Sequence, residues 1–250
     1  MVKNSIRRIE RWVSSLNYRN ILPLTSDSGV VSFSFDDAPK SACYEGRHIL
    51  EKYGCRGTWY IAGGLTNKLN QGHLCHSESD VSDLFKNDHH IGCHTFSHHA
   101  CDAISKNELE LEFQRNSEYF NQIGLPPDQR HFSFPFGAYD LKSKRMASDY
   151  FLSSRITGGG FHVDYADLNE LKAERLYQGL ITLDRLSELM SSVSRKKGWL
   201  ILYTHDVTPT PSEWGCTENL LDYAVQAALA ADCKVMPVDK AIDYFSANNK

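Results

Sequence analysis

The chain has 250 residues, of which 41% are hydrophobic, and a formal net charge of −4 at pH 7. This length suits one α/β domain, or at most two small ones, and the hydrophobic share supports a substantial core. The weak negative charge argues against a nucleic-acid track over the surface, so no nucleic-acid partner is expected. No segment approaches the run of about 18 apolar residues that a membrane-spanning helix needs. We therefore expect one domain that covers residues 1–250.

The cysteines and the N-terminus bear on the cellular compartment. Seven cysteines are scattered along the chain, without a Cys-x-x-Cys pair. An odd and scattered set favours reduced, mostly buried thiols in a reducing compartment over a disulfide framework. The N-terminus also lacks the uninterrupted apolar run of a signal peptide. Together these features predict a cytoplasmic protein.

Residues 1–20 have the pattern of an amphipathic helix. Ile6, Ile9, Val13 and Leu16 fall on one helical face, and basic side chains surround them. Two interpretations follow from this pattern. The helix covers one end of the fold, or residues 1–16 make a peripheral contact with an anionic inner-membrane surface.

Strand-like and helix-like segments alternate along the rest of the chain. Strands are expected over residues 30–35, 57–62, 90–93, 131–136, 150–156, 175–180, 199–203 and 234–238. Helices are expected over residues 41–53, 79–87, 105–123, 141–148, 183–195, 217–231 and 239–246. Polar loops cover residues 66–78 and 158–167. This alternation indicates parallel βαβ units, and their number favours a closed (β/α) barrel of about seven parallel strands.

Polar side chains stand at several expected strand ends. Asp36 and Asp37 end the first strand, and two adjacent carboxylates are costly there unless a cation or a shared proton relieves them. His94 and His98, four residues apart, follow the third strand. His205 follows the penultimate strand. Because the carboxyl ends of parallel strands share one face of a barrel, we expect these side chains to meet there.

Two histidines and one carboxylate form a ligand set typical of a catalytic zinc site with open positions for water. The alternative is a merely solvated histidine cluster, because His89, His90 and His99 crowd the same stretch. The acidic strand end upstream and the histidine-bearing strand end downstream favour the metal site.

These motifs resemble those of the polysaccharide deacetylase family, the NodB-homology group of carbohydrate esterases. The family's first motif appears as Ser34-Phe35-Asp36-Asp37 and its second, His-x-x-x-His, as His94 to His98. The third appears as Ser133-Phe134-Pro135-Phe136 and the last as Tyr203-Thr204-His205. The resemblance runs from about residue 30 to residue 244, and it implies a distorted barrel of the NodB-homology type over that range.

The resemblance also implies a role for each motif residue. Asp37, His94 and His98 would hold one divalent metal, with zinc as the default and cobalt or nickel as alternatives. Asp36 would be the general base, and His205 would be the general acid. The main-chain N–H of Phe136 would help to stabilise the oxyanion.

Two departures from the family pattern and one unassigned role need an explanation. Ser133 stands where the family usually has an arginine that braces the base, and we expect Arg155 or Arg175 to approach Asp36 instead. Tyr203 replaces a leucine, so it forms either a polar wall of the acyl pocket or a plain core side chain. The carboxylate that orients His205 is left open; the candidates are Asp164, Asp167, Asp184 and Asp206.

Two further patterns have mostly structural interpretations. His73, Cys75 and His76 could form a second metal site, but a solvated loop is the favoured interpretation. Residues 158–160 are three glycines without the following helix of a phosphate-binding loop, so they predict a flexible loop.

The leading functional hypothesis is a hydrolase that removes an N-acetyl group from an amino sugar, in a precursor of surface polysaccharide or lipopolysaccharide. A second hypothesis keeps the hydrolase but changes the bond, to a deformylase of a lipid-linked sugar or a non-sugar amidohydrolase. A third is a metal-retaining sugar-binding module without turnover.

Overall fold

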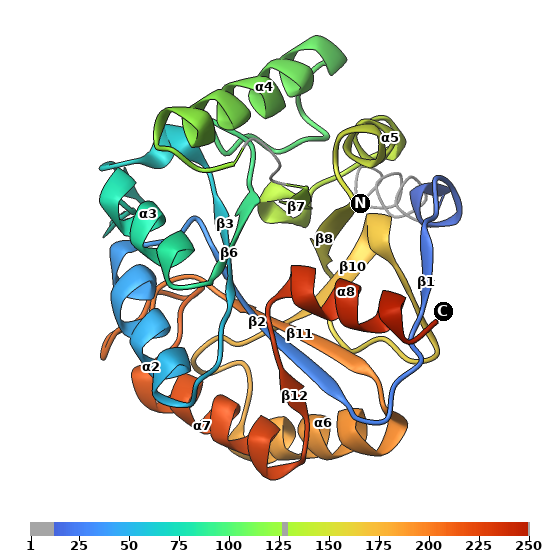
Figure 1. Ribbon diagram of the computed structural model, residues 1–250. Helices are drawn as coiled ribbons and strands as arrows, with labels where there is room; N and C mark the ends of the chain where they lie inside the picture. The colour runs from blue at the N-terminus through green and yellow to red at the C-terminus, as the bar shows by residue number, and fades with distance from the viewer. Residues whose placement is uncertain (1–12, 127–129, 250) are drawn as a thin grey trace, which may run out of the picture.

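The computed structural model describes residues 13–126 and 130–249, and these fold around a closed barrel of seven parallel strands (Figure 1). The barrel closes where the first strand pairs with the last, from Val30 opposite Trp199 to Phe35 opposite Thr204. The predicted barrel is therefore confirmed. Its strands, in order around the barrel, are β2 (Val30–Asp36), β3 (Thr58–Ile61), β6 (His90–Cys93), β7 (His131–Ser133), β8 (Ser153–Thr157), β10 (Leu171–Arg175) and β11 (Trp199–Thr204).

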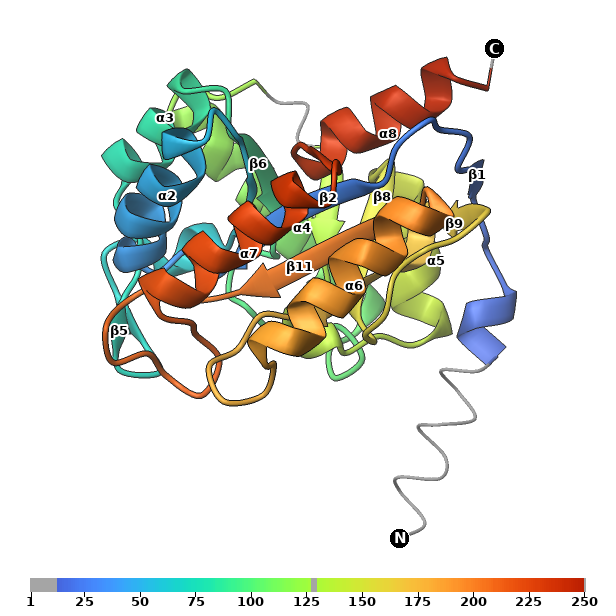
Figure 2. The ribbon, with the colours of Figure 1, turned by 90° about the horizontal axis from the view of Figure 1, so that it is seen from below.

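Helices surround the barrel, and Figure 2 shows two of them, α6 and α7, lying along the outside of β2 and β11. The outer helices are α2 (Arg47–Lys52), α3 (Glu78–Lys86), α4 (Lys106–Gln122), α5 (Leu141–Tyr150), α6 (Leu183–Lys196) and α7 (Glu218–Ala230). Ser105 caps α4, and Glu108 completes the predicted capping box. No helix among the described residues is both long and apolar enough to cross a membrane.

The last helix, α8 (Val238–Ala247), crosses the N-terminal end of the barrel (Figure 1). Its first N–H, at Val238, donates to Thr58 Oγ1 at the start of β3 (3.0 Å). Apolar side chains of α8, including Ile242 and Phe245, pack into the same buried cluster as Val30 and Trp199. α8 therefore covers this end of the barrel.

Alternation along β2 divides the core into two layers. Val31, Phe33 and Phe35 point outward, into the cluster that packs beneath the helices. Val30 belongs to the inner cluster, as do Trp199 and Tyr203 of β11. β2 is buried on both faces along its whole length, so Ser32 and Ser34 are buried together with its hydrophobic residues, up to Asp36 at its end.

Three minor pairings complete the sheet structure. β12 (Lys234–Val235) pairs with Val30 and Val31, the half of the β2 edge that β3 leaves uncovered. β1 (Ile21–Pro23) pairs with β9 (Tyr165–Asp167). β4 (Leu69–Asn70) and β5 (His73–Leu74) form a hairpin within residues 66–78, where a plain loop was predicted.

Several predicted boundaries were wrong. The strand expected over residues 175–180 is β10, which lies at Leu171–Arg175. β7 ends at Ser133, three residues early, because Pro135 follows and Phe136 takes a left-handed conformation (φ 59°). α5 continues to Tyr150, so β8 begins later than expected. Residues 1–12 of the predicted N-terminal helix lie outside the described residues, and 13–16 are helical. All seven cysteines are buried with free thiols, as predicted.

Candidate active site

A cavity of about 230 Å³ opens at the C-terminal end of the barrel. Side chains from several strand ends and from the hairpin line it, as expected for the functional face of a parallel barrel. The lining residues are Asp36, Asp37, Gln71, His94, His98, Phe136, Gly137, Thr157, Arg175, Tyr177, Tyr203, His205 and Trp214. Every motif residue for which the sequence predicts a catalytic or metal-binding role lines this cavity.

Asp37, His94 and His98 form one cluster. Asp37 follows β2 directly, in a left-handed conformation (φ 60°), and is almost fully buried. Its Oδ1 lies 2.9 Å from His98 Nε2 and 3.5 Å from His94 Nε2. One ligand atom from each residue falls within 4.8 Å of the other two. Among the described residues, this is the only such group of three.

The environment prepares His94 as a neutral ligand. Its Nδ1 lies 2.7 Å from the main-chain carbonyl of Ser133, which can only accept, so Nδ1 carries the proton and Nε2 has a free lone pair. Burial lowers the pKa of His94 to about 4, so the ring is neutral at pH 7. A carbonyl that fixes the distal nitrogen is the usual partner of a metal-binding histidine.

The cluster fits a divalent metal. Asp37 Oδ1 is buried and receives no hydrogen bond from the described residues, although an uncompensated buried carboxylate oxygen is costly. Burial alone would raise the pKa of Asp37, but the close contact and charge of His98 and the charge of His94 lower it below its usual value. An ionised carboxylate and two imidazoles are a donor set for zinc, and cobalt and nickel also accept imidazole.

Asp36, the predicted base, is braced by an arginine from another strand. Arg155 of β8 is 1% exposed, and its Nη2 donates to Asp36 Oδ2 and to Ser133 Oγ. The guanidinium carbon also lies 4.7 Å from the ring centroid of Tyr203. Of the two arginines predicted to approach Asp36, Arg155 makes the contact.

Arg175 and Ser133 therefore support the site in ways that the motif alone does not show. Arg175 lines the cavity and hydrogen-bonds Tyr203 instead of Asp36. Ser133 is fully buried and small, and its hydroxyl accepts from the Arg155 guanidinium. Tyr203 satisfies both interpretations offered for it, because it lines the cavity and is also 97% buried beneath Arg155, with 3% exposed.

His205 is oriented by a main-chain carbonyl. Its Nδ1 lies 3.1 Å from the carbonyl oxygen of Trp214, so this nitrogen donates and Nε2 is left for chemistry. Asp167 was wrong as a candidate to orient His205, because its carboxylate pairs with Lys144 (3.3 Å) and Arg19 (3.8 Å). Asp206 accepts from the N–H and hydroxyl of Ser212. Sequence reasoning missed the Trp214 carbonyl as the partner of His205, because every residue has a main-chain carbonyl and no residue type marks this one.

Phe136 has an unusual conformation beside His98. Its φ of 59° is left-handed, and its ring is 59% exposed and 4.6 Å from the ring of His98. A non-glycine residue in this region is strained, and such strain often accompanies a functional site. The part of its N–H in oxyanion stabilisation stays a prediction.

The hairpin supplies two residues that sequence reasoning missed. Asn70 Nδ2 donates to Asp37 Oδ2 (2.8 Å), and Gln71 at the tip lines the cavity. A usable signal was Gly72 after Gln71, because a two-residue turn with a glycine favours a hairpin. His73, Cys75 and His76 do not form the second metal site considered above. His76 instead turns inward, with Nδ1 3.2 Å from the Asp37 carbonyl.

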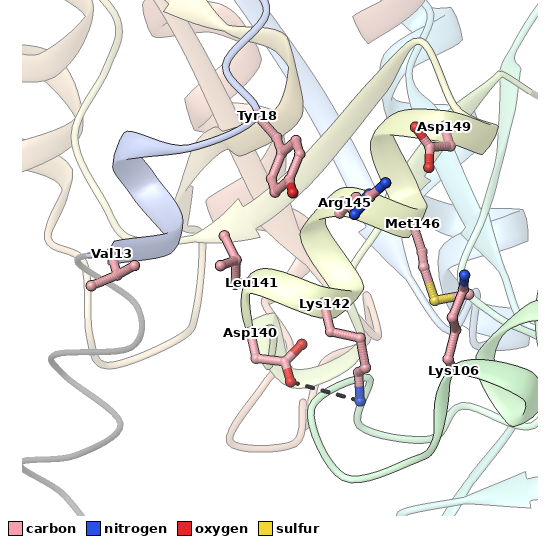
Figure 3. A pocket seen from close by; sticks show the side chains of 9 residues that line it. All are labelled: Val13, Tyr18, Lys106, Asp140, Leu141, Lys142, Arg145, Met146 and Asp149. Carbon is pink, nitrogen blue, oxygen red and sulfur yellow. Dashed lines mark ion pairs between the residues drawn. The ribbon is translucent and has the colours of Figure 1, made fainter.

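A larger cavity, of about 670 Å³, lies away from these residues (Figure 3). It is bounded by residues 13–18, by the start of α4 and by α5. Three cations, Lys106, Lys142 and Arg145, line it, and Lys142 pairs with Asp140 (3.6 Å). Val13, from the apolar face of the predicted N-terminal helix, also lines it. Its wall contains none of the predicted catalytic residues.

Known proteins are similar to this chain in sequence and in fold. A chitin deacetylase of Arthroderma benhamiae is 26% identical over 121 residues, which cover 48% of this chain and only 31% of that protein. A crystal structure of a peptidoglycan N-acetylglucosamine deacetylase matches with a TM-score of 0.63 and 15% identity, over 92% of this chain and 94% of that one. A CE4 family pseudoenzyme of Bacillus anthracis matches with a TM-score of 0.60 and 14% identity, over 86% and 66%.

The family relationship follows from the sequence match, which covers the strand with Asp36 and Asp37 and continues through the third motif. The polysaccharide deacetylase family model matches residues 24–152, slightly more than half of the chain. The structural neighbours have the same fold, and the motif residues converge in one cavity. The chain belongs to the polysaccharide deacetylase family.

Proposed function

We propose that this protein is a metal-dependent hydrolase that removes the N-acetyl group from an amino sugar. One observation carries the proposal. The buried, unpartnered Asp37 Oδ1 lies against His94 and His98, while Asp36 and His205 line the same cavity. Amide hydrolysis needs a metal-ligand set, a base and an acid within reach of one carbonyl carbon.

Asp37, His94 and His98 would hold the divalent metal, with zinc as the first expectation. When bound, such a metal lowers the pKa of water and polarises a carbonyl. Asp36 would take the proton from the attacking water, because Arg155 holds one of its oxygens and leaves Oδ1 without a donor. An arginine that holds one oxygen also fixes the direction in which the carboxylate presents the other.

His205 would deliver the proton that the departing amine needs. The Trp214 carbonyl orients the ring through Nδ1, so the proton would leave from Nε2. The N–H of Phe136 would donate to the oxygen that becomes negative in the transition state, as in an oxyanion hole. Base and acid are therefore different residues, as the two proton transfers require.

The proposed substrate is an acetylated amino sugar in a precursor of surface polysaccharide or lipopolysaccharide. The chitin deacetylase relative supports an acetylated sugar. A cavity of about 230 Å³ supports a substrate that inserts one acetamido-bearing unit. Peripheral contact of residues 1–16 with the inner membrane, on the cytoplasmic side, is part of the proposal and depends on the amphipathic pattern alone.

The test is acyl release from a panel of N-acetylated sugars, including N-acetylglucosamine oligomers and nucleotide-linked and lipid-linked precursors. Zinc-loaded protein is expected to release acetate, and both chelation and Asp37→Ala are expected to abolish the release. Absence of acyl release from the whole panel, with metal bound, would contradict the proposal.

The same assay separates the alternatives. Formate in place of acetate would indicate the deformylase, and release from non-sugar amides alone would indicate the amidohydrolase. Sugar binding with bound metal and no release would indicate a silent module, a possibility raised by the pseudoenzyme neighbour. The main sequence argument for a silent module was the missing motif arginine, and Arg155 weakens it by pairing with Asp36.

A further inference from the structure

The β4–β5 hairpin is a built feature next to the proposed metal ligands. Its two turn residues, Gln71 and Gly72, both have positive φ (49° and 85°), as a tight two-residue hairpin turn requires. Below the turn, the Cys75 N–H donates to the Lys68 carbonyl (2.9 Å) and the Asn67 N–H to the His76 carbonyl (2.8 Å). The hairpin is therefore an ordered arm held by its own hydrogen bonds.

The arm makes three hydrogen bonds to the segment that follows β2. Asn70 Nδ2 donates to Asp37 Oδ2 (2.8 Å). The ring of His76 donates through Nδ1 to the Asp37 carbonyl (3.2 Å), and the His76 N–H donates to the Ala38 carbonyl (3.0 Å). His76 is fully buried, and its Nε2 lies 3.1 Å from Thr66 Oγ1. Both the backbone and the carboxylate of Asp37 are therefore fixed from the same arm.

The contact with Asn70 gives the two carboxylate oxygens of Asp37 different surroundings. Oδ2 accepts the amide N–H, whereas Oδ1 faces the Nε2 atoms of His98 and His94 without a donor. A carboxylate held in this way offers one oxygen to a cation. In two-oxygen binding, Oδ2 would share its lone pairs between the cation and the Asn70 amide, so the contact favours binding through Oδ1 alone.

We propose that Asn70 is a positioning residue that keeps Asp37 as a one-oxygen ligand and raises the affinity of the site for its metal. The inference depends on the proposed metal site but is independent of which sugar is the substrate. It places metal retention partly under the control of the arm, whose tip residue Gln71 lines the substrate cavity. Residues that orient metal ligands in this way typically change metal affinity about 10- to 100-fold when they are replaced.

The experiment compares Asn70→Ala and Asn70→Leu with the unsubstituted chain. Asn70→Leu keeps about the same volume but removes the amide donor. The matched control is Leu69→Ala, because Leu69 is the preceding residue on the same strand and is 73% exposed. Zinc dissociation constants are measured by competition with a chromophoric chelator. The absorption bands of the cobalt-loaded proteins report the coordination geometry.

Both Asn70 variants are expected to bind zinc about 10- to 100-fold more weakly, with altered cobalt bands, while Leu69→Ala keeps the unsubstituted values. Unchanged zinc affinity in Asn70→Leu would overturn the inference, because side-chain volume alone would then suffice. An equal loss in Leu69→Ala would also overturn it, because the cause would then be loss of the arm. Failure of the unsubstituted chain to bind zinc or cobalt would instead overturn the proposed metal site, and this inference with it.

Discussion

The two ends of the barrel both carry paired histidines, yet only one end forms a ligand set. At the C-terminal end, His94 and His98 face a carboxylate oxygen at 3.5 and 2.9 Å. At the N-terminal end, His90 and His131 meet edge to face, 4.8 Å between ring centroids. There, His131 Nδ1 contacts Ser153 Oγ (2.8 Å), and a cavity of about 620 Å³ lies alongside.

This difference shows what a histidine pair needs before it can serve as a candidate metal site. Burial lowers the pKa of His94 to about 4 and the pKa of His90 and His131 to about 3, so the rings at both ends are neutral at pH 7. Neutral imidazoles beside a large cavity are therefore insufficient to form a metal-ligand set. The C-terminal end adds an ionised carboxylate within reach of both Nε2 atoms, and a carbonyl that fixes the tautomer of His94.

The largest expected effect comes from removing that carboxylate. Asp37→Ala should lower deacetylation about 10³-fold or more, because several kcal/mol of metal-dependent stabilisation are lost at about 1.4 kcal/mol per tenfold. Bound metal, measured by elemental analysis, should fall with the activity. The matched change at the other end, His131→Asn, should leave the bound metal unchanged. Metal loss in His131→Asn alone would reverse the comparison.

The next effect separates acid chemistry from metal binding at the C-terminal end. His205→Gln should lower kcat about 10²- to 10⁴-fold, the usual contribution of a positioned acid. Bound metal should stay at the unsubstituted level, because His205 is outside the Asp37, His94 and His98 group. A parallel fall in bound metal would make His205 a ligand instead of the acid.

A smaller effect on activity, coupled to stability, is expected at Arg155. Arg155→Met leaves Asp36 buried without its cation, and breaking a buried pair costs about 3 to 5 kcal/mol. Chemical denaturation should show this loss, and kcat should fall while bound metal persists. Arg155→Lys keeps the positive charge but loses the planar guanidinium. Its stability and kcat should therefore lie between those of the unsubstituted chain and those of Arg155→Met. Unchanged stability in Arg155→Met would show that the pair with Asp36 is not formed in solution.

The smallest effect on activity is expected at the N-terminal end, where the change is instead a pH dependence of stability. The unfolded chain protonates His90 and His131 near their usual pKa of 6.5, whereas the folded chain does so only near 3. The free energy of unfolding should therefore fall as the pH drops from 6.5 towards 3, because the unfolded chain then binds protons that the folded chain does not. Denaturation of His90→Gln at several pH values should show a shallower fall. A slope equal to that of the unsubstituted chain would mean that His90 is already accessible to protons.

The sequence was sufficient for the barrel and for the convergence of Asp37, His94 and His98, because period-two strands and polar strand ends are local signals. For the brace it offered Arg155 and Arg175, both near expected strand ends, and the structure places Arg155 against Asp36. Sequence reasoning failed at β10, although Leu171 and Ala173 are buried and Lys172 and Glu174 are not, which is strand alternation. The charged side chains of this short strand concealed that pattern.

Other features could not be predicted because they depend on contacts between distant segments. The β4–β5 hairpin has only two residues in each strand, too few for a periodic signal. Its position depends on Asp37 and Ala38, more than 30 residues earlier. The early end of β7 follows from Pro135 and the left-handed Phe136, a conformation that a phenylalanine does not signal in the sequence.

Arg155 of β8 contacts both Asp36 and Ser133, so the side chains at positions 133 and 155 share one buried space beside Asp36. The guanidinium of Arg155 fills the buried space beside the Ser133 hydroxyl. A second arginine at 133 would therefore force two cations into room for one, and an arginine there becomes compatible only if 155 shrinks at the same time.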